Sequence, residues 1–143
     1  MNIAVFVSLL LLAGCATVPP APVEMQTLAS GSYAATTPDA PEAHFVRDAA
    51  AFRVAWASMI GEGEAPQVDF ESSSVVILLG GERLTGGWTV EPQSAQADDT
   101  TVSITAVIKS PPARSIVTHA LTSPWAVVVV PKRESLRSVR WER

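Results

Sequence analysis

The chain has 143 residues, of which 48% are hydrophobic and 17% charged, and it carries a net charge of −4 at pH 7. This length accommodates one modest domain with a short appendage, and the composition is that of a globular protein. The acidic balance without a basic patch excludes the nucleic-acid-binding class, and the single cysteine excludes an intrachain disulfide.

The first fourteen residues have the form of a secretory signal. Ile3 to Leu12 is a ten-residue stretch in which only Ser8 is polar, whereas a membrane-spanning helix needs about 20 apolar residues. Residues 12–15 read Leu-Ala-Gly-Cys and closely resemble the lipobox of bacterial lipoproteins. The resemblance implies cleavage before Cys15, a diacylglycerol on its thiol and an acyl chain on the new amino terminus. Cys15 is then a membrane anchor.

Residues 15–31 are expected to form a Pro-rich tether, because they contain three prolines and show no periodicity that could build a core. The sequence therefore divides into a signal peptide (1–14), a lipidated cysteine with its tether (15–31) and one domain (32–143). Residue 16 is not aspartate, and in a Gram-negative host the lipoprotein sorting pattern then implies the outer membrane, facing the periplasm.

The clearest predicted helix begins after Asp48, a suitable N-cap, and ends at Gly61, a typical C-terminal stop. A short strand is expected on each side of the Pro-rich loop that precedes it, at 32–36 and 44–46. Apolar residues recur at helical spacing and form one stripe. The stripe comprises Phe52, Ala55, Trp56, Met59 and Ile60. These side chains are expected to belong to the core.

From Val68 onward the pattern is that of β-structure. The continuous apolar runs 75–79 and 125–130 predict central strands covered on both faces, and the alternation over 101–108 predicts a strand with one solvent-facing side. Further candidate strands are 88–90, 116–121 and 138–142, with a polar turn region at 92–99. The predicted fold class is α+β, with one early helix packed on a mainly antiparallel sheet or small β-barrel of about six strands.

Nothing in the sequence favours catalysis. His44 and His119 are the only imidazoles, no Gly-x-Ser-x-Gly motif occurs, and the cysteine and histidines do not form a zinc pattern. Glu62 and Glu64 lie in a Gly-rich loop that would hold a carboxylate pair poorly. We therefore expect a protein that is not an enzyme and takes no metal or cofactor, apart from the lipid on Cys15.

Two stretches place a tryptophan directly after turn-forming residues: Leu84–Trp88 reads LTGGW and Leu121–Trp125 reads LTSPW. In one interpretation glycine and proline set the turns, and each tryptophan begins a strand and covers the edge of the core. In the other, both loops lie at one end of the sheet and present a shallow aromatic site to a partner. The candidate contact residues are Thr85, Gly86, Gly87, Trp88, Pro124 and Trp125.

The order of several short motifs over residues 44–132 resembles the PrcB C-terminal domain family. The motifs are Val68-Asp69-Phe70, Val75–Gly80, Thr85–Trp88, Pro111-Pro112 and Thr122–Lys132. The resemblance implies a non-enzymatic accessory lipoprotein that binds or stabilises an envelope protein, and the name-giving member implies a protease complex as one such partner. It supplies no catalytic residues to carry over to this chain.

Two alternatives stay open. Thr85–Trp88 and Pro124-Trp125 loosely resemble two loops of chagasin-type cysteine-protease inhibitors, which lie at one end of an immunoglobulin-like sandwich. Arg83-Leu84 and Ser123 stand where that family has Asn-Pro and Arg. The other alternative is a periplasmic domain that binds a small ligand, which requires an apolar pocket inside the sheet.

Overall fold

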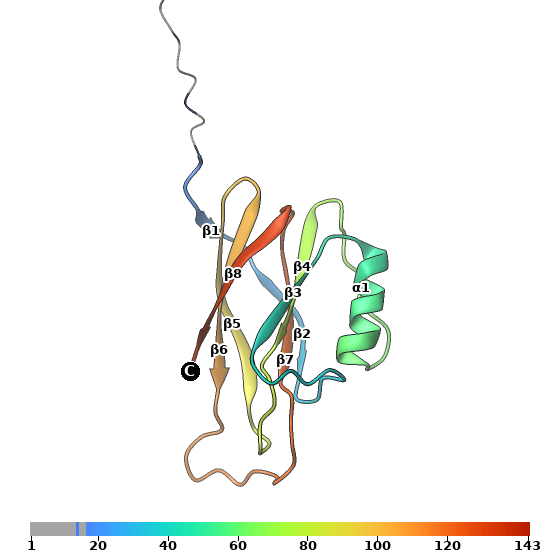
Figure 1. Cartoon of the computed structure of the whole chain (residues 1–143), viewed down its shortest axis with the longest axis vertical. Helices are drawn as coiled ribbons and strands as arrows, with labels where there is room; N and C mark the ends of the chain where they lie inside the picture. Colours follow the sequence, from blue (N-terminus) through green and yellow to red (C-terminus); the bar gives the residue numbers. More distant parts are fainter. Residues whose placement is uncertain (1–13, 15–16) are drawn as a thin grey trace, which may run out of the picture.

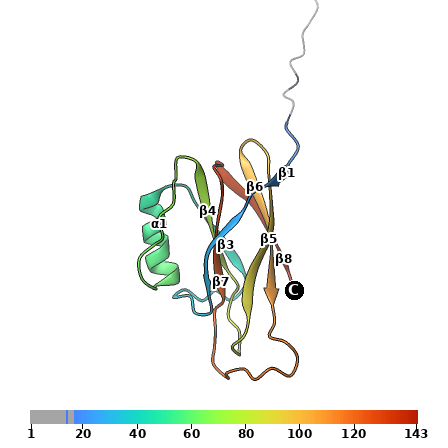
Figure 2. The same ribbon diagram turned by 180° about the vertical axis from the view of Figure 1, so that it is seen from behind.

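The computed structural model describes residue 14 and residues 17–143. This part of the chain forms two four-stranded sheets packed face to face, with one α-helix on the outer side of the second sheet (Figure 1; Figure 2 shows the view from behind). The α+β class with a single early helix is compatible with this architecture. The expected single sheet or closed barrel of about six strands is wrong, since the described residues form eight strands in two separate sheets.

The first sheet has the order β1-β5-β6-β8. Its strands are antiparallel except for the last pair, in which β8 runs parallel to β6. The strands are β1 (Ala21–Val23), β5 (Thr89–Ala97), β6 (Thr101–Lys109) and β8 (Ser135–Glu142). The alternating stretch 101–108 is thus confirmed as a strand, and the predicted edge strand at 138–142 exists but begins three residues earlier.

The second sheet is antiparallel throughout and has the order β2-β7-β4-β3. Its strands are β2 (Gln26–Gly31), β7 (Trp125–Pro131), β4 (Ser73–Leu79) and β3 (Glu42–Val46). The two continuous apolar runs form the central pair β4–β7, as the sequence predicts for strands covered on both faces.

Residues of β4 alternate between two hydrophobic clusters, because successive side chains of a strand point to opposite faces. Val76 and Leu78 pack between the sheets against β6 residues such as Ile104. Val75 and Ile77 pack on the other side, under the helix. One strand therefore supports both layers of the core.

The helical segment consists of α1 (Ala49–Ala55) and a π-helical continuation, Trp56–Ile60. The Asp48 carboxylate accepts a hydrogen bond of 2.8 Å from the backbone N–H of Ala51, and Gly61 ends the helix in the left-handed conformation with φ of 77°. Phe52, Trp56 and Ile60 are buried against the second sheet. The predicted cap, stop and apolar stripe are therefore confirmed.

Residues 21–31 are not a tether, which corrects the prediction for 15–31. β1 pairs with β5 in the first sheet and β2 pairs with β7 in the second, so this segment passes from one sheet to the other. Pro22 is compatible with β1 because a strand at the edge of a sheet can lack one N–H donor. The domain therefore begins at β1 rather than at Ser32.

Three shorter predictions are also wrong. Residues 92–97 continue β5 instead of forming a turn, with a register shift between Pro92 and Ser94 that accommodates the proline. Residues 116–121 belong to an exposed loop rather than a strand. The expected strand at 32–36 is reduced to a single bridge between Tyr33 and Ser123.

The predicted lipidation site lies outside the described residues, since Leu12, Ala13 and Cys15 of the lipobox are not among them. Over residue 14 and residues 17–143, no helix combines the length and apolar character needed to cross a membrane.

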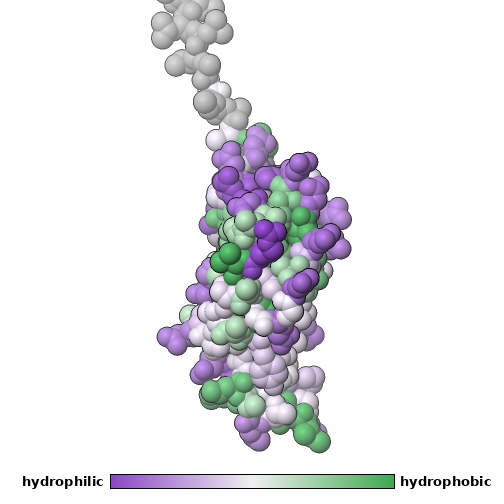
Figure 3. All heavy atoms as spheres, turned by 90° about the vertical axis from the view of Figure 1, so that its right-hand side faces the viewer, coloured by the Kyte–Doolittle hydropathy of each residue, from purple (hydrophilic) through white to green (hydrophobic). Residues whose placement is uncertain are grey.

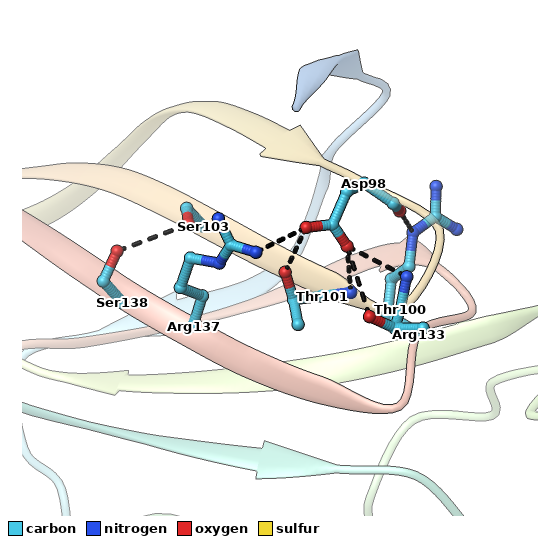
Figure 4. A network of polar contacts seen from close by, with 7 residues as sticks. All are labelled: Asp98, Thr100, Thr101, Ser103, Arg133, Arg137 and Ser138. Carbon is cyan, nitrogen blue, oxygen red and sulfur yellow. Dashed lines mark hydrogen bonds and ion pairs between the residues drawn. The ribbon is translucent and has the colours of Figure 1, made fainter. Parts of the chain in front are cut away.

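The turn between β5 and β6 is fixed by the carboxylate of Asp98 (Figure 4). It accepts hydrogen bonds from the backbone N–H groups of Thr100 and Thr101, at 2.9 and 2.7 Å, and forms an ion pair of 2.6 Å with Arg137 of β8. Arg133 donates to the backbone carbonyl of Asp98 at 2.6 Å. The hydrogen bonds from Thr101 and Thr100, with a smaller contribution from Arg137, lower the pKa of Asp98 to about 2.

Asp98→Asn is expected to lower the melting temperature at neutral pH, because the carboxylate is bound more favourably in the folded state than in the unfolded state. A carboxylate whose pKa is lowered by folding stabilises the folded state at pH values above its pKa in the unfolded chain, which is near 3.8. This stabilisation is lost as the pH falls towards the folded-state pKa of about 2. Thermal melts of wild type and variant should therefore converge over this range. Asp99→Asn is the matched control and should leave the melting temperature unchanged; a gap as large at pH 2 as at neutral pH would contradict the assignment.

Gly31→Ala tests whether β2 belongs to the domain. A Cβ at this position would lie 2.7 Å from the Trp125 indole, a ring held in place by Trp56 at a centroid distance of 5.7 Å. We expect a loss of about 1–3 kcal/mol in the free energy of unfolding, as for other overpacked sites, measured by urea denaturation. Ser30→Ala, a change at the neighbouring exposed position, is the control. Equal stability of the two variants would indicate that β2 does not pack as described.

Candidate functional site

The two predicted loops lie together at one end of the sandwich, which we call the loop end: residues 80–88 and 110–124 (Figure 1). β5 begins at Thr89, beside the loop end, and finishes at Ala97, which pairs with Ala21 of β1. Nine residues of strand at roughly 3.3 Å each separate these points. The loop end therefore lies roughly 30 Å from the place where the N-terminal segment enters the domain.

The two loops are hydrogen-bonded to each other. Arg83 and Thr122 exchange both of their backbone hydrogen bonds at 2.8 Å, and the Gly86 N–H donates to the Thr118 carbonyl at 2.9 Å. The Thr122 hydroxyl donates to the Thr85 carbonyl, also at 2.8 Å. The LTGGW and LTSPW stretches thus form one structural unit, although they are more than thirty residues apart in the sequence.

The two glycines of the first loop are required by its packing. Gly87 has a φ of 84°, and a Cβ there would lie 2.8 Å from the Pro111 side chain. A Cβ on Gly86 would lie 2.5 Å from the Thr118 hydroxyl. Both glycines therefore serve the contact between the loops, and Gly87 also has the positive φ that the turn interpretation predicts.

Trp88 is half-buried and is held by two neighbours. Its indole N–H donates to the Thr85 hydroxyl at 3.2 Å, and the Arg83 guanidinium lies 4.9 Å from the ring centroid, in cation–π geometry. Arg83 also donates to the Gly80 carbonyl at 2.8 Å. Burial, with a smaller contribution from the charge of Arg143, lowers the pKa of Arg83. Trp88 is thus bound to the first loop on two sides.

Pro124 and Trp125 do not face a partner. Both are buried, and Trp125 is only 4% exposed because it packs edge-on against Trp56 and covers Gly31. These two residues belong to the turn and to the core, which corrects their assignment as contact residues. Of the predicted set, Thr85 and Trp88 keep partly exposed side chains.

Exposed apolar side chains are concentrated at the loop end. Among the described residues, six large apolar side chains are exposed, and the four that lie here form what we call the apolar patch. The apolar patch comprises Tyr33, Leu84, Ile116 and Leu121, which are 55%, 77%, 103% and 59% exposed. Tyr33 joins the patch through its bridge to Ser123, and together with Leu121 it lines a depression of about 160 Å³. Figure 3 shows apolar side chains at this tip of the molecule.

The sequence pattern gave little indication of the apolar patch. Leu84 flanks the TGGW turn, and Ile116 and Leu121 lie in a stretch that resembles a short strand. Tyr33 lies fifty or more residues away from all three. An apolar residue in a loop without periodicity is the only local signal, and it does not distinguish exposure from burial.

Other candidate groups lie elsewhere. His44 is hydrogen-bonded to the Glu42 carboxylate at 2.8 Å, and His119 is exposed in the second loop. Within the described part of the chain, no three or more His, Cys, Asp or Glu side chains form a group that could hold a metal ion. A groove of about 580 Å³ lies between α1 and residues 63–70, outside the sheets, whereas the space between the sheets is occupied by the core.

Comparison with protein families matches residues 74–131 to the family described as PrcB C-terminal. The matched segment runs from β4 to β7 and contains both loops of the loop end. Comparisons with curated proteins and with solved structures gave no match. The resemblance seen in the motifs is therefore confirmed over this segment, and residues 74–131 of this chain are PrcB-like.

Proposed function

We propose that this protein is a non-enzymatic envelope lipoprotein, anchored through lipid on Cys15, whose domain binds and stabilises an envelope protein through the loop end. The observation that carries the proposal is the apolar patch: exposed apolar side chains gather on hydrogen-bonded loops at the end opposite the N-terminal entry. Rigid loops that present exposed apolar and aromatic side chains are typical of protein interaction sites.

The position of the proposed anchor supports this orientation. Five residues, 16–20, separate Cys15 from β1, so the domain would lie within roughly 20 Å of the membrane. The loop end would then be its membrane-distal end and would face the periplasm, from the outer membrane, in a Gram-negative host. The resemblance to the PrcB family makes a protease complex one candidate partner.

The chagasin-type alternative is less well supported, because it needs both tryptophan loops to reach a protease. Trp125 is buried under the helix and Pro124 is buried beside it. A small-ligand site inside the sheet is likewise disfavoured, because side chains of both sheets fill that space.

Cys15→Ser is expected to release the protein from membranes, because the lipid attaches to the cysteine thiol and serine offers none. The measurement is fractionation of cells after labelling with a clickable palmitate analogue. Wild type should be labelled and pellet with membranes, and the variant should be unlabelled and soluble or uncleaved. Thr17→Ala is the control and should behave like wild type. A Cys15→Ser variant that keeps the label would exclude the anchor.

Leu84→Asp combined with Ile116→Asp is expected to reduce recovery of the partner about tenfold or more, because the two carboxylates would be buried without partners in an apolar contact. The measurement is crosslinking in intact cells followed by quantitative mass spectrometry of the captured proteins. Val54→Asp is the matched control, because Val54 is 71% exposed on the helix. If the double variant and the control recover the same proteins equally, the apolar patch is not the contact site.

A further inference from the structure

β8 and the residues next to it are basic in an otherwise acidic protein. Residues 132–143 contain five of the ten Lys and Arg residues but only two of the fourteen Asp and Glu residues. The preceding 131 residues contain five basic and twelve acidic residues. Positive charge is thus enriched over residues 132–143, with Arg137 and Arg140 in β8 itself and Lys132, Arg133 and Arg143 beside it.

β8 is also the longest strand at the margin of either sheet. It has eight residues, roughly 26 Å of backbone, whereas β1, at the other margin of the same sheet, has three. β6 is the only strand that pairs with β8 among the described residues. The opposite edge of β8 therefore presents N–H and C=O groups that an extended segment could pair with.

The inner face of β8 is apolar but incompletely covered. Leu136, Val139 and Trp141 pack against the inter-sheet core and are all only half-buried. Arg140, which alternates with them, is exposed on the outer face beside Thr105. An additional strand paired with β8 would cover the apolar side chains of β8 with those on its own inner face. The side chains on the outer face of the additional strand would lie beside Arg140.

The basic edge continues towards the loop end. β8 runs parallel to β6, and its last residue, Glu142, pairs with Val107 near the end of β6, so Arg143 follows on the side of the loop end. At the other end of β8, Arg137 is already paired with Asp98. Among the described residues Arg137 is the one basic residue of 132–143 that forms an ion pair, so Arg140 within the strand keeps its charge without a carboxylate partner.

We propose that the free edge of β8 accepts an extended segment of a partner protein in which apolar residues alternate with Asp or Glu. The apolar residues would pack beside Leu136, Val139 and Trp141, and the carboxylates would lie beside Arg140. A second copy of β8 fits less well as the added strand. If two copies paired antiparallel about their midpoints, Arg137 of each copy would lie opposite Arg140 of the other, and opposed like charges are destabilising. This surface is separate from the apolar patch, so it is an additional contact beyond the proposed function.

The test uses the full mature chain and three labelled peptides of the same length as β8. The first alternates valine with glutamate, the second has lysine in place of glutamate, and the third is the first with alternate backbone amides methylated. Binding is measured by fluorescence anisotropy at low ionic strength, and hydrogen exchange of the complex locates the site. We expect only the first peptide to bind, with slowed exchange confined to residues 133–143.

Arg140→Glu is expected to weaken binding about fivefold or more, because it replaces a cross-strand attraction with a repulsion. Arg53→Glu makes the same charge change at an exposed position of the helix and should leave binding unchanged. Arg140→Gln, a milder change, should give an intermediate loss. The proposal is overturned if no peptide binds, or if the lysine peptide or the methylated peptide binds as tightly as the glutamate peptide. It is also overturned if Arg140→Glu and Arg53→Glu weaken binding to the same extent, or if sedimentation shows a dimer formed through β8.

Discussion

The structure depends on the pairing of β4 with β7. The two strands run antiparallel over seven residue pairs, from Ser73 and Pro131 to Leu79 and Trp125, and alternate side chains of each enter the inter-sheet core or the layer under the helix. Strands covered on both faces carry almost only aliphatic residues, and burial of each large aliphatic side chain stabilises the fold by on the order of 1.5–3 kcal/mol. The helix and the first sheet are both attached to this one pair.

The same pairing positions the candidate site. Leu79 pairs with Trp125, so the chain leaves β4 and enters β7 at the same level, and the Gly80 N–H donates to the Pro124 carbonyl at 2.8 Å. The loops on either side must therefore begin next to each other. Their hydrogen bonds extend this contact outward, which leaves the apolar patch on a rigid base rather than on two independent loops.

Much of the architecture could be predicted from local signals. Asp48 and Gly61 bound the helix, and the two apolar runs are the central strands, because these patterns act within a few residues. The strand with which a segment pairs depends on residues far away in the sequence. Pro22 therefore looked like part of a tether, although it lies in the edge strand β1. Pro92 looked like part of a turn, although it lies in β5 at a register shift. Trp88 and Trp125 have similar local sequences, yet only the position of β7 in the centre of its sheet decides that Trp125 is buried.

The N-terminal segment joins the proposed anchor to both sheets, and this arrangement has a mechanical consequence. β1 has only three residues, of which two are exposed, whereas β2 is longer and packs beside Trp125. With the proposed anchor in place, tension between membrane and domain would act first on the short pairing of β1 with β5 and only then on the longer pairing of β2 with β7. Loss of β1 would uncover only the half-buried Val23 at the rim of the inter-sheet core, while β2 stays packed beside Trp125.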